Sequence, residues 1–185
     1  DEYLSGNVRK KLAQAAASGE RFRGNVLALD QVAPQDIEAG MIVARLGAVW
    51  IPAVDVEAFA RYLFGDEEVT IAYSADAGAW HASSSDWRMR QNVKATQEFG
   101  THRLHGMELL EHALNGQAPT VRDKDPKSDR YIVNRVETLA AREKLGTINQ
   151  RFGIWLFEDP ERRERLVRLY NDLFNSTRVR QFDGS

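Results

Sequence analysis

The sequence predicts a mostly helical α+β fold: a single domain with a small antiparallel sheet and two long C-terminal helices. Apolar residues recur at helical spacing over much of the 185-residue chain, whereas only short segments cluster β-branched and aromatic residues. Strands do not alternate regularly with helices, which argues against a doubly wound parallel sheet. We expect a mixed part over residues 1–130 and a helical part over residues 131–185.

Short helices are expected first along the chain. Ser5 or Asn7 can cap a helix that ends near Gly19, and residues 25–32 form a second helix that stops before Pro34.

The clearest helix follows Pro52. Asp55 lies in its expected first turn, where a carboxylate favours the positive end of the helix dipole, and Gly65 supplies a stop. The apolar positions keep a helical spacing, which predicts a face buried in the core: Val56, Phe59, Ala60, Leu63 and Phe64.

The sheet is expected after this helix. Residues 69–73 are β-branched and aromatic, residues 76–78 offer a turn, and residues 79–82 can return as the second strand of a hairpin. Residues 119–122 offer a third strand.

Helices are expected again in the second half of the chain. Thr101 is the expected N-cap of a helix to Leu114, and Asp159 followed by Pro160 marks the start of the last helix. Residues at roughly helical spacing indicate the buried side of the helix before Asp159: Val133, Val136, Ala140, Ile148, Phe152 and Trp155. The expected buried stripe of the last helix is Leu166, Leu169, Tyr170, Leu173 and Phe174.

The amino-acid composition and net charge argue against several classes of function. The sequence has no cysteine, which removes disulfide and thiol chemistry and favours a reducing, cytoplasmic compartment. No apolar run approaches the roughly 20 residues that span a bilayer, so no membrane partner is expected. The net charge of -2 means that nucleic-acid binding would depend on a local patch.

Signature motifs of common catalytic sites are absent from the sequence. There is no Gly-x-x-x-x-Gly-Lys-Ser/Thr loop, no Gly-x-Gly-x-x-Gly after a strand and no Gly-x-Ser-x-Gly elbow. The Asn/Asp-Pro-Pro-Tyr/Phe run of amino-methyltransferases is also missing. We therefore expect neither a catalytic residue nor a cofactor in this chain.

Histidines supply the one metal hypothesis. His105, Glu108 and His112 share a predicted helix at a spacing that lets them face one way, with His102 nearby. Such a set could serve a metal-dependent hydrolase. No further ligand set accompanies it, so we favour an ordinary polar helix face and expect no metal.

Basic residues supply the nucleic-acid hypothesis. Three clusters occur, and the run from Arg88 to Lys94 is the best of them because it contains no acidic residue and follows Trp87. Arginines after Pro160 alternate with glutamates, which indicates a solvated, self-paired surface. Ordinary solvated charge is the alternative for every cluster. The candidate nucleic-acid contacts are Arg88, Arg90, Lys94, Arg103, Arg9, Lys10 and Lys11.

Several segments, taken in order and with their spacing, resemble one family of proteins. They are residues 3–12 (Tyr-Leu-Ser-Gly-Asn-Val-Arg-Lys-Lys-Leu), 46–52 (Leu-Gly-Ala-Val-Trp-Ile-Pro), 99–103 (Phe-Gly-Thr-His-Arg), 170–175 (Tyr-Asn-Asp-Leu-Phe-Asn) and 182–185 (Phe-Asp-Gly-Ser). The family consists of very large phage- and plasmid-borne polypeptides that join an adenine-specific DNA methylase to a Swi/Snf-type helicase. The resemblance covers nearly the whole chain.

The resemblance implies a parent protein that acts on DNA and uses ATP and S-adenosylmethionine. It places this chain outside the methylase motifs, near the start of the helicase part, and transfers no catalytic residue to it. A start at Asp1 and an end at Ser185 without a polar tail agree with a segment of a larger polypeptide. The expected partners are therefore DNA and the neighbouring helicase and methylase domains.

Two functions follow from these observations. The first is a non-catalytic accessory or connecting domain that contacts DNA beside the parent's catalytic parts. The second is a purely structural interaction domain that docks those catalytic domains without touching nucleic acid.

Overall fold

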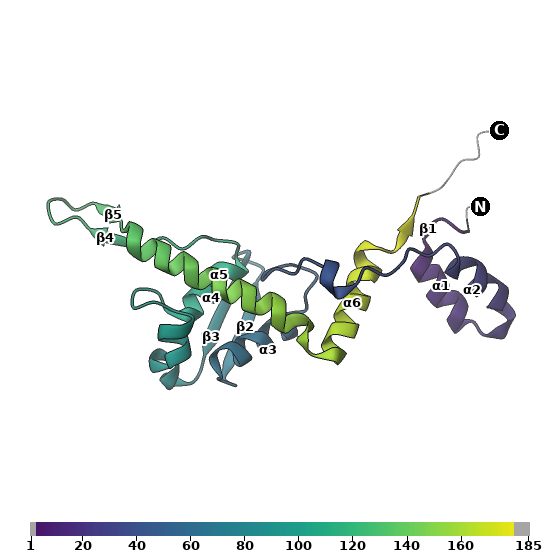
Figure 1. Cartoon of the computed structure of the whole chain (residues 1–185), viewed down its shortest axis with the longest axis horizontal. Helices are drawn as coiled ribbons and strands as arrows, with labels where there is room; N and C mark the ends of the chain where they lie inside the picture. The colour runs from purple at the N-terminus through teal and green to yellow at the C-terminus, as the bar shows by residue number, and fades with distance from the viewer. Residues whose placement is uncertain (1–2, 180–185) are drawn as a thin grey trace. The chain divides into compact units, whose positions relative to one another are not determined.

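The computed structural model describes residues 3–179, and its contacts divide the chain into two compact units. Unit 1 joins the chain up to Ile42 to the part from Pro160 onward, and unit 2 is continuous from Val43 to Asp159. The predicted class is confirmed, because the fold is mostly helical α+β with small antiparallel sheets (Figure 1). The expected boundary at residue 130 lies inside unit 2, and residues 180–185 lie outside the described range.

Unit 1 consists of helices and one very short strand pair. Its elements are β1 (Gly6–Asn7), α1 (Val8–Ala17), η1 (Glu20–Phe22), α2 (Arg23–Asp30), η2 (Ala39–Met41), α6 (Pro160–Phe174) and β6 (Thr177–Arg178). Asn7 caps α1 by accepting from the Lys10 amide at 2.9 Å, as the sequence predicts. Val8, Ala15 and Leu29 form the buried centre of the α1–α2 pair.

The buried stripe predicted for α6 is wrong for its last two members, and Leu169 and Tyr170 are only half-buried. Leu166 is buried, but Leu173 and Phe174 are more than half exposed, and Asn171 is fully buried instead. The amide of Asn171 explains this, because its Oδ1 accepts from the Ile37 amide at 2.8 Å and its Nδ2 donates to the Ile37 carbonyl at 3.0 Å. The two hydrogen bonds between Asn171 and the backbone of Ile37 therefore determine which side of α6 is buried.

Unit 2 surrounds a hairpin with helices. Its elements are α3 (Ala53–Phe64), β2 (Val69–Ser74), β3 (Ala79–Ser84), η3 (Trp87–Gln91), η4 (Lys94–Glu98), α4 (Gly106–Leu114), β4 (Arg122–Lys124), β5 (Tyr131–Val133) and α5 (Arg135–Glu158). The predicted face of α3 is confirmed, since all five of its apolar residues are buried. Phe59 packs edge-on against Phe152 of α5, with 4.9 Å between ring centroids.

Side chains from α3 and α4 cover both edges of the predicted hairpin. On the β2 edge, Glu57 Oε2 accepts from the Ile71 amide at 3.0 Å. On the β3 edge, Asn115 brackets the backbone of Trp80 with bonds of 2.8 and 2.9 Å. These contacts satisfy strand groups that would otherwise be open to pairing, and they fix the hairpin against the helices.

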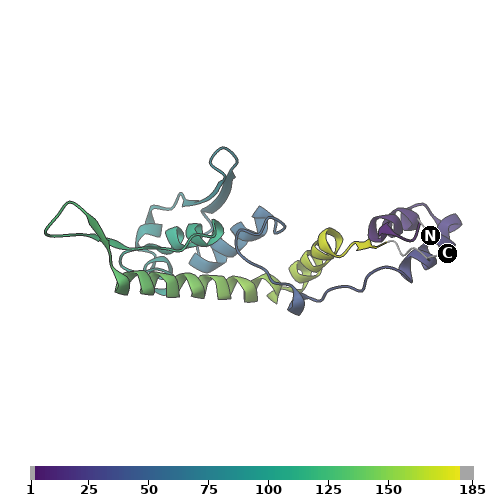
Figure 2. The same ribbon diagram turned by 90° about the horizontal axis from the view of Figure 1, so that it is seen from above.

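A second ribbon, β4 with β5, is separate from this hairpin. The strand expected at residues 119–122 begins only at Arg122, and it pairs Arg122 with Val133 rather than joining the hairpin. The ribbon projects beyond the first turn of α5 in both views (Figure 1 and Figure 2). Val133 and Val136 are consequently exposed, and the predicted buried side of α5 holds only from Ile148 onward.

The start of α4 also differs from the prediction. Thr101 does not cap the helix, because its hydroxyl accepts from the amides of Arg103 and Leu104 in a tight turn. His105 is the cap, and its Nδ1 accepts from the Met107 amide at 3.2 Å. None of the helices within residues 3–179 is both long and apolar enough to cross a membrane.

Candidate nucleic-acid interface

A hollow in unit 2 lies where β3 ends and η3 begins. It has a volume of about 940 Å³. Its lining is mostly polar, with two methionines at the base: Ser84, Ser85, Asp86, Trp87, Met89, Arg90, Gln91, His105 and Met107. The hollow thus joins part of the best basic cluster of the sequence, including Arg90, to His105, which the sequence suggested as a metal ligand.

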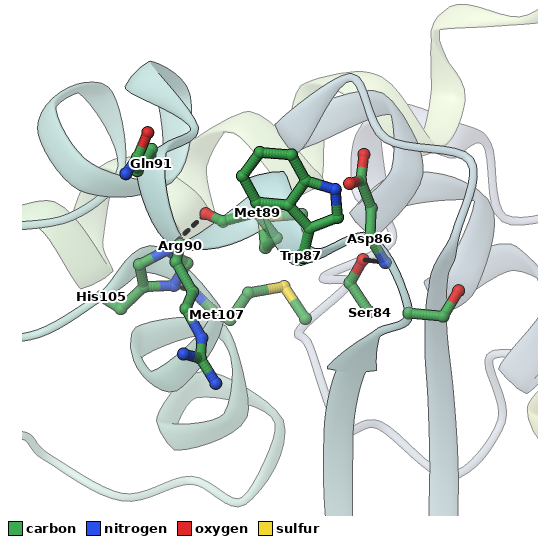
Figure 3. Close-up of a pocket in the computed structure, with 9 residues that line it drawn as sticks. Ser84, Asp86, Trp87, Met89, Arg90, Gln91, His105 and Met107 are labelled. Atoms are coloured by element: carbon green, nitrogen blue, oxygen red, sulfur yellow. Dashed lines mark hydrogen bonds between the residues drawn. The ribbon is translucent and has the colours of Figure 1, made fainter.

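Two loops are held together to form this hollow. Asp86 begins η3 by accepting from the Arg88 amide at 2.9 Å, and Met89 is buried beneath the turn. His105 Nδ1 already accepts a backbone proton, so Nε2 carries the ring hydrogen and donates to the Met89 carbonyl at 3.0 Å. One histidine therefore fastens the first turn of α4 to η3 (Figure 3).

Glycines allow the loop before α4 to approach this closely. A Cβ at Gly100 would collide with the carbonyl oxygen of Ala95, and one at Gly106 would lie 2.9 Å from the Phe64 ring. Neither position could accept a side chain without backbone movement. The spacing of these two glycines therefore fixes where His105 can sit.

Trp87 and Arg90 are an exposed aromatic and an exposed cationic side chain of the hollow. Trp87 is 75 % exposed, so it is a surface aromatic residue and not part of the core. The two side chains leave η3 in different directions, with the Met107 thioether between them in this view (Figure 3). Arg90 has no hydrogen-bond or ion-pair partner within residues 3–179.

Arg88 differs from Arg90 because it is already paired. Its Nε lies 3.0 Å from both carboxylate oxygens of Asp86, and its Nη2 lies 2.9 Å from one of them. Hydrogen bonding from Arg88 lowers the pKa of Asp86, and the same contact raises the pKa of Arg88. The run from Arg88 to Lys94 contains no acidic residue. The positive charge of Arg88 is nevertheless neutralised by Asp86, which lies just before the run.

A neighbouring surface beside η3 is acidic. A second hollow of about 760 Å³ lies there, and it is lined by Gly65, Asp66, Glu67, Glu68, Asp86, Trp87, Arg88, Met89, Gln91 and Asn92. Asp66 accepts from the Ser84 hydroxyl and Glu68 from the Ser85 hydroxyl, so these carboxylates are fixed beside the hairpin end. The first hollow is therefore lined by the unpaired cation Arg90, whereas the second is lined by the carboxylates of Asp66, Glu67 and Glu68.

The remaining candidates of unit 2 lie away from the hollow. Lys94 is exposed at the start of η4, where its Nζ would lie 3.6 Å from a Cβ placed at Gly65. Arg103 is held by β4, since its guanidinium donates to Asp123 Oδ1 at 2.7 Å and to the Arg122 carbonyl at 3.2 Å. Arg103 therefore acts as a link between the loop and the ribbon.

Residues 45–176 match the model of one protein family, which is described as a domain of unknown function (DUF8437). The chain belongs to this family. No curated protein matches the chain, and no solved structure matches it. The DUF8437 region contains every residue that lines the hollow beside η3.

The basic cluster of α1 lies outside the DUF8437 match, in unit 1. Arg9 is occupied within the fold, because its side chain is only 11 % exposed and donates to the carbonyls of Asn175 and Pro34 and to Asp36. Lys11 donates to two backbone carbonyls near Tyr3, whereas Lys10 is exposed. Only Lys10 of this cluster is thus presented to solvent as an available charge.

The histidines of the DUF8437 region are dispersed by the fold. Both ring nitrogens of His105 are engaged by backbone groups, and His102 lies 3.6 Å from Glu137 at the start of α5. Nδ1 of His112 is buried without a partner. Within residues 3–179, no group of three or more histidine or acidic side chains is placed to hold a metal ion.

Asp86 is a site residue that the sequence reasoning missed, as are Ser84, Ser85 and Met107. The order Ser85-Asp86-Trp87-Arg88 contains an available signal, because aspartate directly before a short turn is a preferred cap and accepts from the amide two residues later.

Proposed function

We propose that this chain is a non-catalytic accessory region of a DNA helicase–adenine methylase polypeptide and that it contacts DNA at the hollow beside η3. The observation that carries the proposal is the pairing of an exposed indole, Trp87, with an unpartnered guanidinium, Arg90, on one short helix. Aromatic and cationic groups in this combination stack on bases and contact phosphates. The resemblance of segments along the chain to helicase–methylase polypeptides supports DNA as the ligand.

Cofactors belong to the parent in this proposal. ATP would serve the neighbouring helicase domain and S-adenosylmethionine the neighbouring methylase domain, in the cytoplasm of the host cell. The present chain lacks the signature loops for either cofactor, so its role is to hold DNA or to connect the two catalytic parts.

The test is a titration of the 185-residue chain with fluorescently labelled DNA at low salt. We expect salt-dependent binding that weakens when Arg90 and Lys94 are both replaced by Ala, with a shallower dependence of log K on log salt. Arg88→Ala is the matched control on the same turn, and it should have a smaller effect because Arg88 is paired with Asp86. Failure to bind either single-stranded or duplex DNA at low salt contradicts the proposal.

A second candidate function is docking of the parent's catalytic domains without DNA contact. It is favoured by an apolar surface on the β4–β5 ribbon and the start of α5, where five residues are about half exposed or more: Tyr131, Ile132, Val133, Val136 and Leu139. Exposed apolar clusters of this kind are typical of protein contacts. Co-purification of the chain with separately expressed helicase and methylase domains, lost on Val136→Asp, is the expected result.

A further inference from the structure

We infer that the hollow beside η3 takes single-stranded rather than duplex DNA, with a base stacked on Trp87 and a phosphate beside Arg90. The inference rests on the proposed function, because it names the form of DNA that the same site would bind. Four features of the hollow lead to it.

The first feature is the free face of the Trp87 ring. Trp80 packs against Tyr73 with 5.2 Å between centroids, and Trp155 packs against Phe59 at 5.4 Å. Trp87 makes no ring contact within residues 3–179, and three quarters of its surface is exposed. An indole that stabilises neither the core nor the hairpin is available to stack on a base.

The second feature is the character of the hollow beside this ring. A volume of about 940 Å³ falls within the range of about 300–1,000 Å³ that small-molecule sites occupy. The Gln91 amide can both donate and accept hydrogen bonds there, the hydroxyl oxygens of Ser84 and Ser85 can accept them, and Met89 and Met107 add apolar surface. Base edges offer both donors and acceptors, so an unpaired base suits such a lining.

The third feature is how little positive charge the surface presents. Among residues 3–179, Arg90 is the one Lys or Arg side chain that lines the hollow, since the neighbouring Arg88 is paired with Asp86 and the exposed Lys94 lies beyond it at the start of η4. A duplex presents about one charge per 1.7 Å of its axis and gains most of its affinity from many phosphate contacts. One available guanidinium beside an aromatic ring suits a single strand, whose stacking energy does not depend on charge.

The fourth feature is the acidic border. Asp66, Glu67 and Glu68 line a neighbouring hollow that also has Trp87 in its lining. The broad, charged backbone of a duplex seated on Trp87 would lie across these carboxylates, whereas a single strand can follow the Arg90 side alone. The bases of a duplex are also stacked on one another, so their faces cannot reach the indole.

The experiment compares a labelled oligothymidylate with a hairpin duplex of the same nucleotide number, both titrated with the full 185-residue chain. We expect the single strand to bind about 10-fold more tightly than the duplex, and Trp87→Ala to remove about that factor, which corresponds to stacking of one base. Trp87→Phe, which keeps a stacking ring, should retain most of the affinity, and Trp87→Leu should not. Tyr131→Ala on the β4–β5 ribbon, outside the lining of the hollow, is the matched control for loss of an exposed aromatic residue and should leave the DNA affinity unchanged.

Salt dependence separates stacking from charge. Trp87→Ala should lower the affinity without changing the slope of log K against log salt, and Arg90→Ala should reduce the slope by about 0.7. Equal or tighter binding of the duplex, or a single-strand affinity that is unchanged in Trp87→Ala, would overturn the inference and leave the proposed function standing. Loss of all DNA binding by the unmodified chain would overturn both.

Discussion

The carboxylate of Asp86 holds both the backbone amide and the guanidinium of Arg88, at distances of 2.9 to 3.0 Å. One acid thereby starts η3 and neutralises its first cation. Because the pKa of Asp86 is lowered chiefly by Arg88, the carboxylate is ionised at neutral pH and the pair persists there.

Asp86→Asn should therefore strengthen DNA binding. Asparagine can still accept from the Arg88 amide and begin the turn, but it no longer cancels the charge of the guanidinium. We expect a lower Kd and a steeper slope of log K against log salt, both measured in the same titration. The increase in slope should not exceed that for about one added phosphate contact. Arg88→Ala added to this variant should abolish the gain; a gain that survives it would mean that Asp86 acts on DNA directly.

Asp123 should make the β4–β5 ribbon sensitive to acid. Its pKa is lowered first by the hydrogen bond from Arg103 and then by the one from Asn134, the N-cap of α5. A carboxyl whose folded pKa lies below its unfolded value stabilises the fold above the unfolded pKa, near 3.9, and loses that contribution as pH falls through the folded pKa. Backbone amide shifts of the ribbon should therefore change below about pH 4.

Asp123→Asn should remove that acid transition. Asp129→Asn is the control, because Asp129 is almost fully exposed at the ribbon's turn and pairs only with Lys124 among the described contacts. The control should keep the acid transition of the amides of β4 and β5 in NMR spectra. A transition that persists in Asp123→Asn would assign the effect to another acid.

The sequence predicts those parts of the fold whose causes are local. The buried face of α3 and the hairpin at residues 69–84 follow from side-chain spacing and turn residues, and both are confirmed. The stripe of α6 could not be predicted in this way, because Asn171 is buried by hydrogen bonds to Ile37, far away in sequence. At the site, Trp87 and Arg90 stood in the expected cluster, but the neutralisation of Arg88 depends on Asp86, which lies just outside it.

Arg9 should matter for the stability of unit 1 and not for DNA binding. Its guanidinium joins α1 to Pro34, Asp36 and Asn175, which are far apart in the sequence. Arg9→Ala should destabilise unit 1 by about 1.5–3 kcal/mol, the range for hydrogen bonds to charged groups. Arg9→Lys should not restore this stability, because an ammonium group lacks the planar, forked donors of the guanidinium. Hydrogen exchange of α1 amides measures the effect, with exposed Lys10→Ala as the control. Unchanged exchange together with weaker DNA binding in Arg9→Ala would instead assign Arg9 to the interface.

Phe152 should be among the most sensitive positions of unit 2. Its ring is fully buried in α5 and meets Phe59 of α3 edge-on, with an interplanar angle of 70°. Replacement by alanine removes this contact and leaves a cavity that rigid helices cannot fill, so we expect a loss of about 3–5 kcal/mol in the free energy of unfolding. Denaturant titration followed by tryptophan fluorescence measures this free energy of unfolding.

Ile154→Ala is the control for this prediction. Ile154 lies two residues further along α5 and is 53 % exposed, so its replacement should change the free energy of unfolding by no more than about 0.5 kcal/mol. Similar losses in both variants would mean that the Phe59–Phe152 contact is not the centre of the core.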